Sequence, residues 1–360
     1  MLSLQTLTLP RAIPPLALSE TSLWKWSANH WIPVPYQFNE YDDNGNIWIE
    51  KVGIAAAGPI NTLDDSDRIL AIDTGAATTK KHITPKDKIV AALISTSGTT
   101  YYLRNTHAPE VEKHVNFSRQ SGVTRTPLYE LSANPDNEII WRSLKDAQAD
   151  SNSAPLIDSL ELEISAGILT SFSRVSLGPK NLKAEVVGSQ GGPLRQTTSY
   201  HIKVVMLGIP VMTVDMQMSR YPAAITFSSN AKIPAAYRAI IRKPRVTIGL
   251  NSPICQSGTV SLGGTPAHPI CLDNNRQIND ISMPVAGKSG VLELTKNGMH
   301  LSVTLENRGD SPLPIEYYLH PSVSGLQGGY KMSHLPDDNI VQFFMSLDFS
   351  RLDSTQNNTH

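Results

Sequence analysis

The sequence has little of what membrane proteins and nucleic-acid-binding proteins usually display. Charged residues make up 18% of the 360 residues, below the roughly 25% that is usual for soluble domains. The net charge of −1 creates no overall field that would attract nucleic acid or an anionic membrane. No run approaches the ~20 apolar residues that a membrane-spanning helix needs. We therefore expect no nucleic-acid partner and no membrane span.

Signatures of catalysis are also scarce. Nucleophile elbows of the Gly-x-Ser-x-Gly type, phosphate-binding loops and dinucleotide fingerprints do not occur. Asp73-Thr74-Gly75 looks like the turn of an aspartic protease, but that chemistry needs two carboxylates that share a proton. The region 251–264, where a second copy is expected, contains no Asp. We predict no metal, no cofactor and no enzymatic activity.

Cysteine is nearly absent, and the two cysteines stand in similar settings. Cys255 and Cys271 each follow a Pro-Ile pair and bracket a Gly-rich segment. This spacing predicts a disulfide at the ends of a hairpin, worth ~3 kcal/mol by loop closure, and hence an oxidising location. The alternative is a pair of buried free thiols in a reducing compartment. Residues 1–22 lack the basic stretch and apolar core of a signal peptide, so either a leader has been removed or the protein acts without export, as a virion protein would.

What is present is the pattern of β-strands. Short runs rich in β-branched and aromatic residues are separated by clusters of Gly, Pro, Asn and Asp, which predicts antiparallel strands joined by turns. The clearest runs are 158–165, 199–207, 298–307 and 341–350.

One segment predicts a helix instead. In Asn137–Ala147, Ile140 and Leu144 are spaced to line one helical face, and Asn134 or Asp136 can cap the first turn.

We expect an all-β protein of two antiparallel β-sandwich domains, immunoglobulin-like or jelly-roll-like, with one or two short helices. The pattern changes between residues 231 and 245, where a short basic stretch separates two series of strands. The predicted organisation is an extended N-terminal arm (1–23), a large β-rich binding domain (24–235), a basic linker (236–245), a smaller pilin-like sandwich (246–353) and a polar tail (354–360).

Four of the five tryptophans lie within 25 residues near the N-terminus. Trp24 and Trp26 alternate, so in a strand they share a face, and Trp31 and Asn29 follow closely. Flat aromatic faces suit sugar rings, so these four residues are candidate ligand contacts. The alternative is an aromatic core against which the N-terminal arm packs.

The basic stretch supplies two further candidates for ligand binding. Arg238 and Arg242 could attract an acidic ligand, and the alternative is a solvated linker.

In size and order, this layout is similar to two-domain fimbrial tip adhesins. The resemblance implies a non-enzymatic subunit of an extracellular surface fibre that binds a glycan or protein receptor through its N-terminal domain. Partners would be sibling subunits, joined by strand addition through segments 2–18 and 340–349, although each segment could equally pair within its own chain. One alternative is a virion capsid or tail protein with two jelly-roll-like units. Another is a carbohydrate-active enzyme with acids from distant strands, for example Asp158, Glu161, Glu163 and Asp215.

Overall fold

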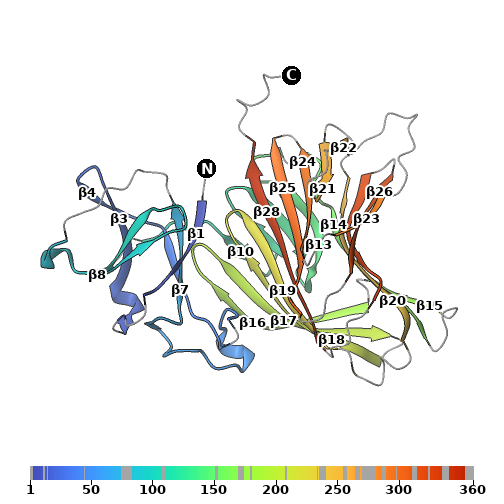
Figure 1. The fold of residues 1–360 in the computed structure, drawn as a ribbon, viewed down its shortest axis with the longest axis horizontal. Helices are drawn as coiled ribbons and strands as arrows, with labels where there is room; N and C mark the ends of the chain where they lie inside the picture. Colours follow the sequence, from blue (N-terminus) through green and yellow to red (C-terminus); the bar gives the residue numbers. More distant parts are fainter. Residues whose placement is uncertain are drawn as a thin grey trace. The chain divides into compact units, whose positions relative to one another are not determined.

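The computed structural model describes residues 3–352 except 11–12, 14, 44, 74–82, 108–109, 151–152, 169–173, 179–180, 207–208, 233, 235–240, 254–257, 264–267, 270–280, 286–288, 297, 310–313, 323–324 and 335–339. Within this part of the chain the regular structure is strand, apart from three single-turn 3₁₀ helices. The prediction of an all-β protein of antiparallel sheets is therefore confirmed (Figure 1). None of the described helices is long and apolar enough to cross a membrane.

The chain forms two compact units. Unit 1 consists of Met1–Val115 and Gly188–Thr197, and unit 2 of Asn116–Val187 and Thr198–His360. The second segment of unit 1 is the tip of a long hairpin whose strands continue in unit 2.

Unit 1 contains three small antiparallel sheets, ordered β1-β7-β5, β4-β3-β9-β8 and β2-β6. Its elements are β1 (Ser3–Thr8), β2 (Leu16–Ala17), η1 (Leu18–Glu20), β3 (Thr21–Ser27), β4 (His30–Pro33), β5 (Tyr36–Asn39), η2 (Glu50–Val52), β6 (Thr62–Leu63), β7 (Arg68–Asp73), η3 (Pro85–Asp87), β8 (Ile89–Ile94) and β9 (Thr100–Asn105).

Unit 2 contains a four-stranded sheet, β10-β11-β12-β13, a six-stranded sheet, β15-β14-β20-β27-β26-β23, and a nine-stranded sheet, β16-β17-β18-β19-β28-β25-β24-β21-β22. The first strands are β10 (Asn116–Ser118), β11 (Val123–Arg125), β12 (Tyr129–Asn134), β13 (Asn137–Asp146), β14 (Ser159–Ile168), β15 (Arg174–Leu177), β16 (Leu182–Gly191), β17 (Gln196–Met206), β18 (Ile209–Arg220) and β19 (Ala224–Lys232). They are followed by β20 (Ile241–Ser252), β21 (Gly258–Leu262), β22 (His268–Pro269), β23 (Ile281–Pro284), β24 (Ser289–Lys296), β25 (Met299–Asn307), β26 (Ile315–Ser322), β27 (Gly325–Met332) and β28 (Ile340–Arg351).

The core of unit 2 follows from strict alternation along its strands. In β25 every second side chain, including Leu301, Val303 and Leu305, is buried, and the side chains between them are partly exposed. This is the period of two that a strand with one buried face requires. One hydrophobic cluster joins such residues from all three sheets, for example Leu131 and Leu250 with Leu301.

The predicted helix over Asn137–Ala147 is wrong, because this segment forms strand β13. Trp141 pairs with Ala133 and Ser143 with Ser132, so Arg142 is an extra residue in the ladder. In a regular strand the side chains that face inward are two positions apart. Because a β-bulge adds one residue, two successive inward side chains are three positions apart at that point. The buried Trp141 and Leu144 therefore mimic the spacing of a helix face in the sequence.

The two units meet along the chain after residues 115, 187 and 197, whereas the predicted linker spans residues 236–245. β14 pairs with β20, and β19 pairs with β28, so strands from either side of that boundary share both large sheets. β20 begins inside the predicted linker, at Ile241.

Both segments that were predicted to be exchanged between subunits are paired within this chain. β1 pairs with β7, and β28 lies between β19 and β25 in the nine-stranded sheet. Strand addition between subunits stays a prediction.

Candidate functional site

Unit 2 holds an apolar cavity of about 560 Å³ between its two large sheets. One side is lined from β14, β15, β20 and β27 of the six-stranded sheet. The other side is lined from β17, β18, β19 and β28 of the nine-stranded sheet. Representative lining residues are Leu162, Ile164, Val246, Met216, Phe227 and Phe343.

Alternation along the strands explains why the lining is apolar. In β14, Leu160, Leu162 and Ile164 are at alternate positions and line the cavity, as do Val214 and Met216 in β18. All five side chains are only partly buried. Protein interiors are normally close-packed, so these side chains present apolar surface to the cavity instead of to neighbouring side chains.

One end of the cavity carries neutral polar groups. Ser159, Asn251 and Gln327 lie side by side in register on β14, β20 and β27, and all three contribute to the lining. The amide Nδ2 of Asn251 donates a hydrogen bond of 2.9 Å to Oγ of Ser159. At the opposite end, the lining residues of β20 are Ile241 and Pro244.

The cavity is almost uncharged. Among the described lining residues, Glu161 and His334 are the ionisable ones, and none is Lys or Arg. Oε2 of Glu161 accepts a hydrogen bond of 2.7 Å from the hydroxyl of Tyr318. Burial, followed by the nearby Glu161 carboxylate, raises the pKa of Tyr318 far above its ordinary value, so this phenol stays a neutral donor.

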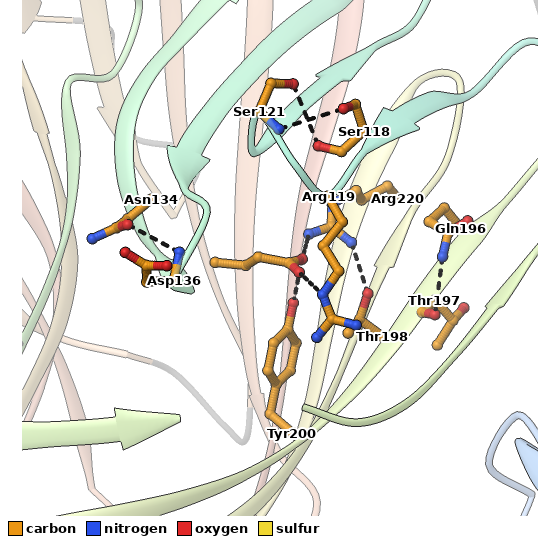
Figure 2. Close-up of polar contacts among 11 residues, drawn as sticks. Ser118, Arg119, Ser121, Asn134, Asp136, Gln196, Thr197, Thr198, Tyr200 and Arg220 are labelled. Atoms are coloured by element: carbon orange, nitrogen blue, oxygen red, sulfur yellow. Dashed lines mark hydrogen bonds and ion pairs between the residues drawn. The ribbon is translucent and has the colours of Figure 1, made fainter. Parts of the chain in front are cut away.

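A buried ion pair lies outside the lining, on the four- and nine-stranded sheets (Figure 2). Oε2 of Glu138 (β13) accepts hydrogen bonds from Nη2 of Arg220 (2.7 Å) and the hydroxyl of Tyr200 (2.8 Å). Arg119 reaches the other carboxylate oxygen, with Nε 3.6 Å from Oε1. Burial raises the pKa of Tyr200 to about 12. This network ties β13 to β17 and β18.

In unit 1 the structure brings the candidate tryptophans together on one face of the β4-β3-β9-β8 sheet. Trp26 and Trp31 meet edge to face with ring centroids 5.0 Å apart. The guanidinium of Arg104 lies over the rings of Trp24 (5.1 Å) and Trp31 (4.5 Å). The indole N–H of Trp24 donates to Ser22, and that of Trp31 to Asp87.

The rings of Trp24 and Trp31 therefore each have the Arg104 guanidinium over one face. Their indole N–H groups already donate hydrogen bonds within unit 1. The arrangement favours a packed aromatic cluster, and a role of Trp24, Trp26 and Trp31 as ligand contacts stays a prediction. Asn29 is exposed in the turn between β3 and β4, with a positive φ of 62°.

The remaining predicted site residues are scattered. Arg242 is exposed on β20, whereas Arg238 and both members of the predicted Cys255–Cys271 bridge lie outside the described residues. No group of three or more His, Cys, Asp or Glu among the described residues could hold a metal ion.

The four acids considered for a carbohydrate-active enzyme are divided between the two large sheets. Glu161 and Glu163 occupy alternate positions of β14, and Asp158 directly precedes that strand. Asp215 lies on β18, in the other large sheet, where it pairs with His201 at 2.8 Å.

Asp73 of the Asp-Thr-Gly motif contacts a lysine. Its carboxylate accepts a hydrogen bond of 3.1 Å from Thr99 and lies 3.6 Å from Nζ of the buried Lys25. Thr74 and Gly75 lie outside the described residues.

No protein-family model matches the chain, and no curated protein does. Among solved structures, it is similar to an α-mannosidase from Enterococcus faecalis V583, with 9% identity and a TM-score of 0.48 over 95% of this chain and 45% of that one. A glycosyl hydrolase family 38 protein from Enterococcus faecalis gives 9% identity and a TM-score of 0.46, over 99% of this chain and 45% of that one. A galactose mutarotase related enzyme from Lactobacillus acidophilus gives 11% identity and a TM-score of 0.39, over 64% of this chain and 98% of that one.

These findings correct the expected function. The similar structures carry the names of carbohydrate enzymes, and none of these three is an adhesin or a pilin. The interpretation as a non-enzymatic fimbrial adhesin is therefore withdrawn, and so is the prediction that the protein is not an enzyme. At these identities the likeness concerns the arrangement of strands, and the chain spans less than half the length of the first of them.

Proposed function

We propose that the protein binds an elongated apolar molecule in the cavity between the two large sheets of unit 2. The observation that supports this is a volume of about 560 Å³ lined by partly buried aliphatic, aromatic and methionine side chains. Ligand pockets typically have about 300–1,000 Å³ and a mainly apolar lining. Methionine suits such a lining because its flexible side chain adapts to ligands of different shape.

An apolar occupant would supply contacts to lining side chains such as Leu162 and Met216, which are only partly buried. Its transfer into the cavity would also remove apolar surface from water, which is favourable.

Fluorescence titration with N-phenyl-1-naphthylamine, a neutral apolar probe, tests the proposal. We expect saturable binding with a dissociation constant in the micromolar range. The lining variants Ala166→Phe and Ala231→Phe fill the cavity and should weaken binding at least tenfold, about 1.4 kcal/mol. Ala92→Phe is the matched control, because Ala92 is an exposed strand residue of unit 1. Absence of saturable binding to the folded protein would contradict the proposal.

A second candidate function is a carbohydrate-active enzyme, which two carboxylates on β14 favour. Glu161 and Glu163 lie at alternate positions of β14, so they share a face of the strand. Glycosidases use two such acids, one on each side of the scissile bond. Hydroxyls of Tyr318 and Ser176 donate to these carboxylates.

Release of reducing sugar from a panel of polysaccharides tests this candidate. Glu163→Gln should abolish the activity, whereas the exposed Glu185→Gln on β16 should leave it unchanged. Equal sugar release by wild type and Glu163→Gln, or none from any substrate, would remove the candidate.

A further inference from the structure

A tyrosine side chain lies across the outer face of the six-stranded sheet, the face turned away from the hydrophobic cluster. Tyr317 and Leu319 on β26 belong to that cluster, so alternation directs Tyr318, which lies between them, to the outer face. The hydroxyl of Tyr318 donates a hydrogen bond of 2.7 Å to Glu161 on β14. In the sheet order, β20 and β27 lie between these two residues. The tyrosine side chain therefore has to cross both strands along the surface of the sheet.

The positions that the tyrosine crosses are glycines. Tyr318 pairs with Gly329 in β27, and Gly329 pairs with Gly249 in β20. Gly249 in turn pairs with Glu161. A Cβ atom at Gly249 would collide with the hydroxyl of Tyr318. The two glycines thus leave the space in which the tyrosine lies against the strand backbones.

The ring of Tyr318 is held in one orientation and keeps an accessible side. The glycine backbones lie beneath it, its hydroxyl is bonded to Glu161, and the side chain is only partly buried. Burial, followed by the carboxylates of Glu161 and Glu163, raises the pKa of Tyr318, which places both acids near the hydroxyl. An aromatic face carries partial negative charge, and the C–H groups of a sugar ring pack against such a face.

A row of polar side chains lies beside the tyrosine. Glu163 pairs with Thr247, and Thr247 pairs with Lys331. Each is two positions along its strand from a member of the first row, so it shares the outer face. One carboxylate oxygen of Glu163 accepts a hydrogen bond from Ser176. Within the part of the chain that the structure describes, the other oxygen and the ammonium of Lys331 have no partner.

This combination suits a ligand with many hydroxyl groups. A carboxylate accepts hydrogen bonds and an ammonium donates them, whereas a sugar hydroxyl can do both. A sugar ring packed on Tyr318 would therefore place hydroxyls within reach of Glu163 and Lys331. A uronic acid would instead bring its own carboxylate close to Glu161 and Glu163, and like charges repel.

We propose that the outer face of the six-stranded sheet binds a neutral saccharide, with one sugar ring on Tyr318 and its hydroxyls bonded to Glu163 and Lys331. The inference goes beyond the proposed apolar binding, because it concerns the opposite face of the sheet. It shares Glu163 with the second candidate function, but it requires no hydrolysis.

Saturation-transfer NMR of the full chain with linear tetrasaccharides tests the inference. The neutral probes are tetramers of mannose, galactose, glucose and xylose, and the anionic probe is the tetramer of galacturonic acid. We expect a signal from at least one neutral tetramer and none from the galacturonic acid tetramer. Absence of signal from all four neutral tetramers, or an equal signal from the anionic one, would overturn the inference.

Variants locate the binding. Tyr318→Ala should weaken it at least about tenfold, as truncation of a central aromatic contact does. Lys331→Gln should also weaken it, and this variant covers the case in which Tyr318→Ala fails to fold. Tyr221→Ala is the matched control, because Tyr221 is a partly buried tyrosine in the turn between β18 and β19, and it should bind as the wild type does. Unchanged binding in both Tyr318→Ala and Lys331→Gln would overturn the inference.

The outcomes separate this inference from both proposed functions. Failure of N-phenyl-1-naphthylamine to bind would overturn the apolar binding and leave the saccharide site standing, since the two sites lie on opposite faces of the sheet. Saccharide binding without release of reducing sugar would remove only the second candidate function.

Discussion

The buried ion pair between Glu138 and Arg220 should be the most sensitive polar contact of unit 2. Their side chains are 2% and 1% exposed, and the carboxylate oxygen and the guanidinium nitrogen are 2.7 Å apart. Replacing Glu138 by Leu would leave Arg220 as a buried charge with no carboxylate beside it. Breaking a buried pair in this way costs about 3–5 kcal/mol, a large part of the ~5–15 kcal/mol that a domain has.

Urea unfolding monitored by circular dichroism measures this loss as a lower midpoint of the unit 2 transition. A double variant, Glu138→Leu with Arg220→Met, should recover most of the stability, because it removes both charges together. The matched control is Glu130→Leu. Glu130 pairs with Arg125 at the same distance of 2.7 Å, but the two side chains are 39% and 67% exposed. Exposed pairs contribute about 0–1 kcal/mol.

A loss of stability in Glu138→Leu no larger than that in Glu130→Leu would contradict this prediction. Losses from Glu138→Leu and Arg220→Met that simply add in the double variant would also contradict it, because residues that form one network are coupled.

Two further predictions concern stability. Burial, with help from Asp64 and Glu40, raises the pKa of Asp67 to about 6, so the folded state binds this proton more tightly than the unfolded state. Unit 1 should lose stability as the pH rises from about 4 to about 6. Thermal melts across this range measure the effect, and Asp67→Asn should remove it. An identical dependence of the melting temperature on pH in the variant would contradict the assignment to Asp67. In Gly249→Ala the new methyl carbon would lie 2.6 Å from the carbonyl oxygen of Gly328, which should cost about 1–3 kcal/mol by overpacking in urea unfolding. Gly178→Ala, where nothing lies within 4 Å, should cost less than Gly249→Ala, and equal costs would contradict the prediction.

The strand pattern was predictable because alternation is a local property of the sequence. The run 298–307 predicted a strand, and β25 covers Met299–Asn307 with every second side chain buried. The run 341–350 likewise falls within β28. In β13 the same rule failed, because the bulge at Arg142 changes the period locally, and a bulge depends on the pairing partner as much as on its own residues.

The cavity could not be predicted from the sequence. Alternation indicates that Val214 and Met216 face the interior, but it says nothing of how far the opposite sheet lies from them. That distance depends on how the six-stranded sheet packs on the nine-stranded sheet. Each of these sheets is assembled from strands far apart in the chain, such as β14 with β20 and β19 with β28. The methionines of β18, Met212 and Met216 among them, are the signal that an analysis of the sequence could have used.

The basic stretch shows the same limit. Its cations were evident in the sequence, and an acidic ligand was one interpretation of them. Arg242 and Arg245 pair with Gly167 and Ser165, which places them on the face of the six-stranded sheet opposite to the cavity-lining Ile164. That placement required the sheet to be known.

The most direct test of apolar binding in unit 2 is a crystal structure with 12-bromododecanoate, in which the anomalous signal of bromine locates the end of the tail. We expect a bromine peak between β14 and β18, near the cavity-lining Leu162 and Met216. A well-ordered crystal soaked at saturating concentration that shows no peak there, or shows bromine only on the outer surface, would contradict it.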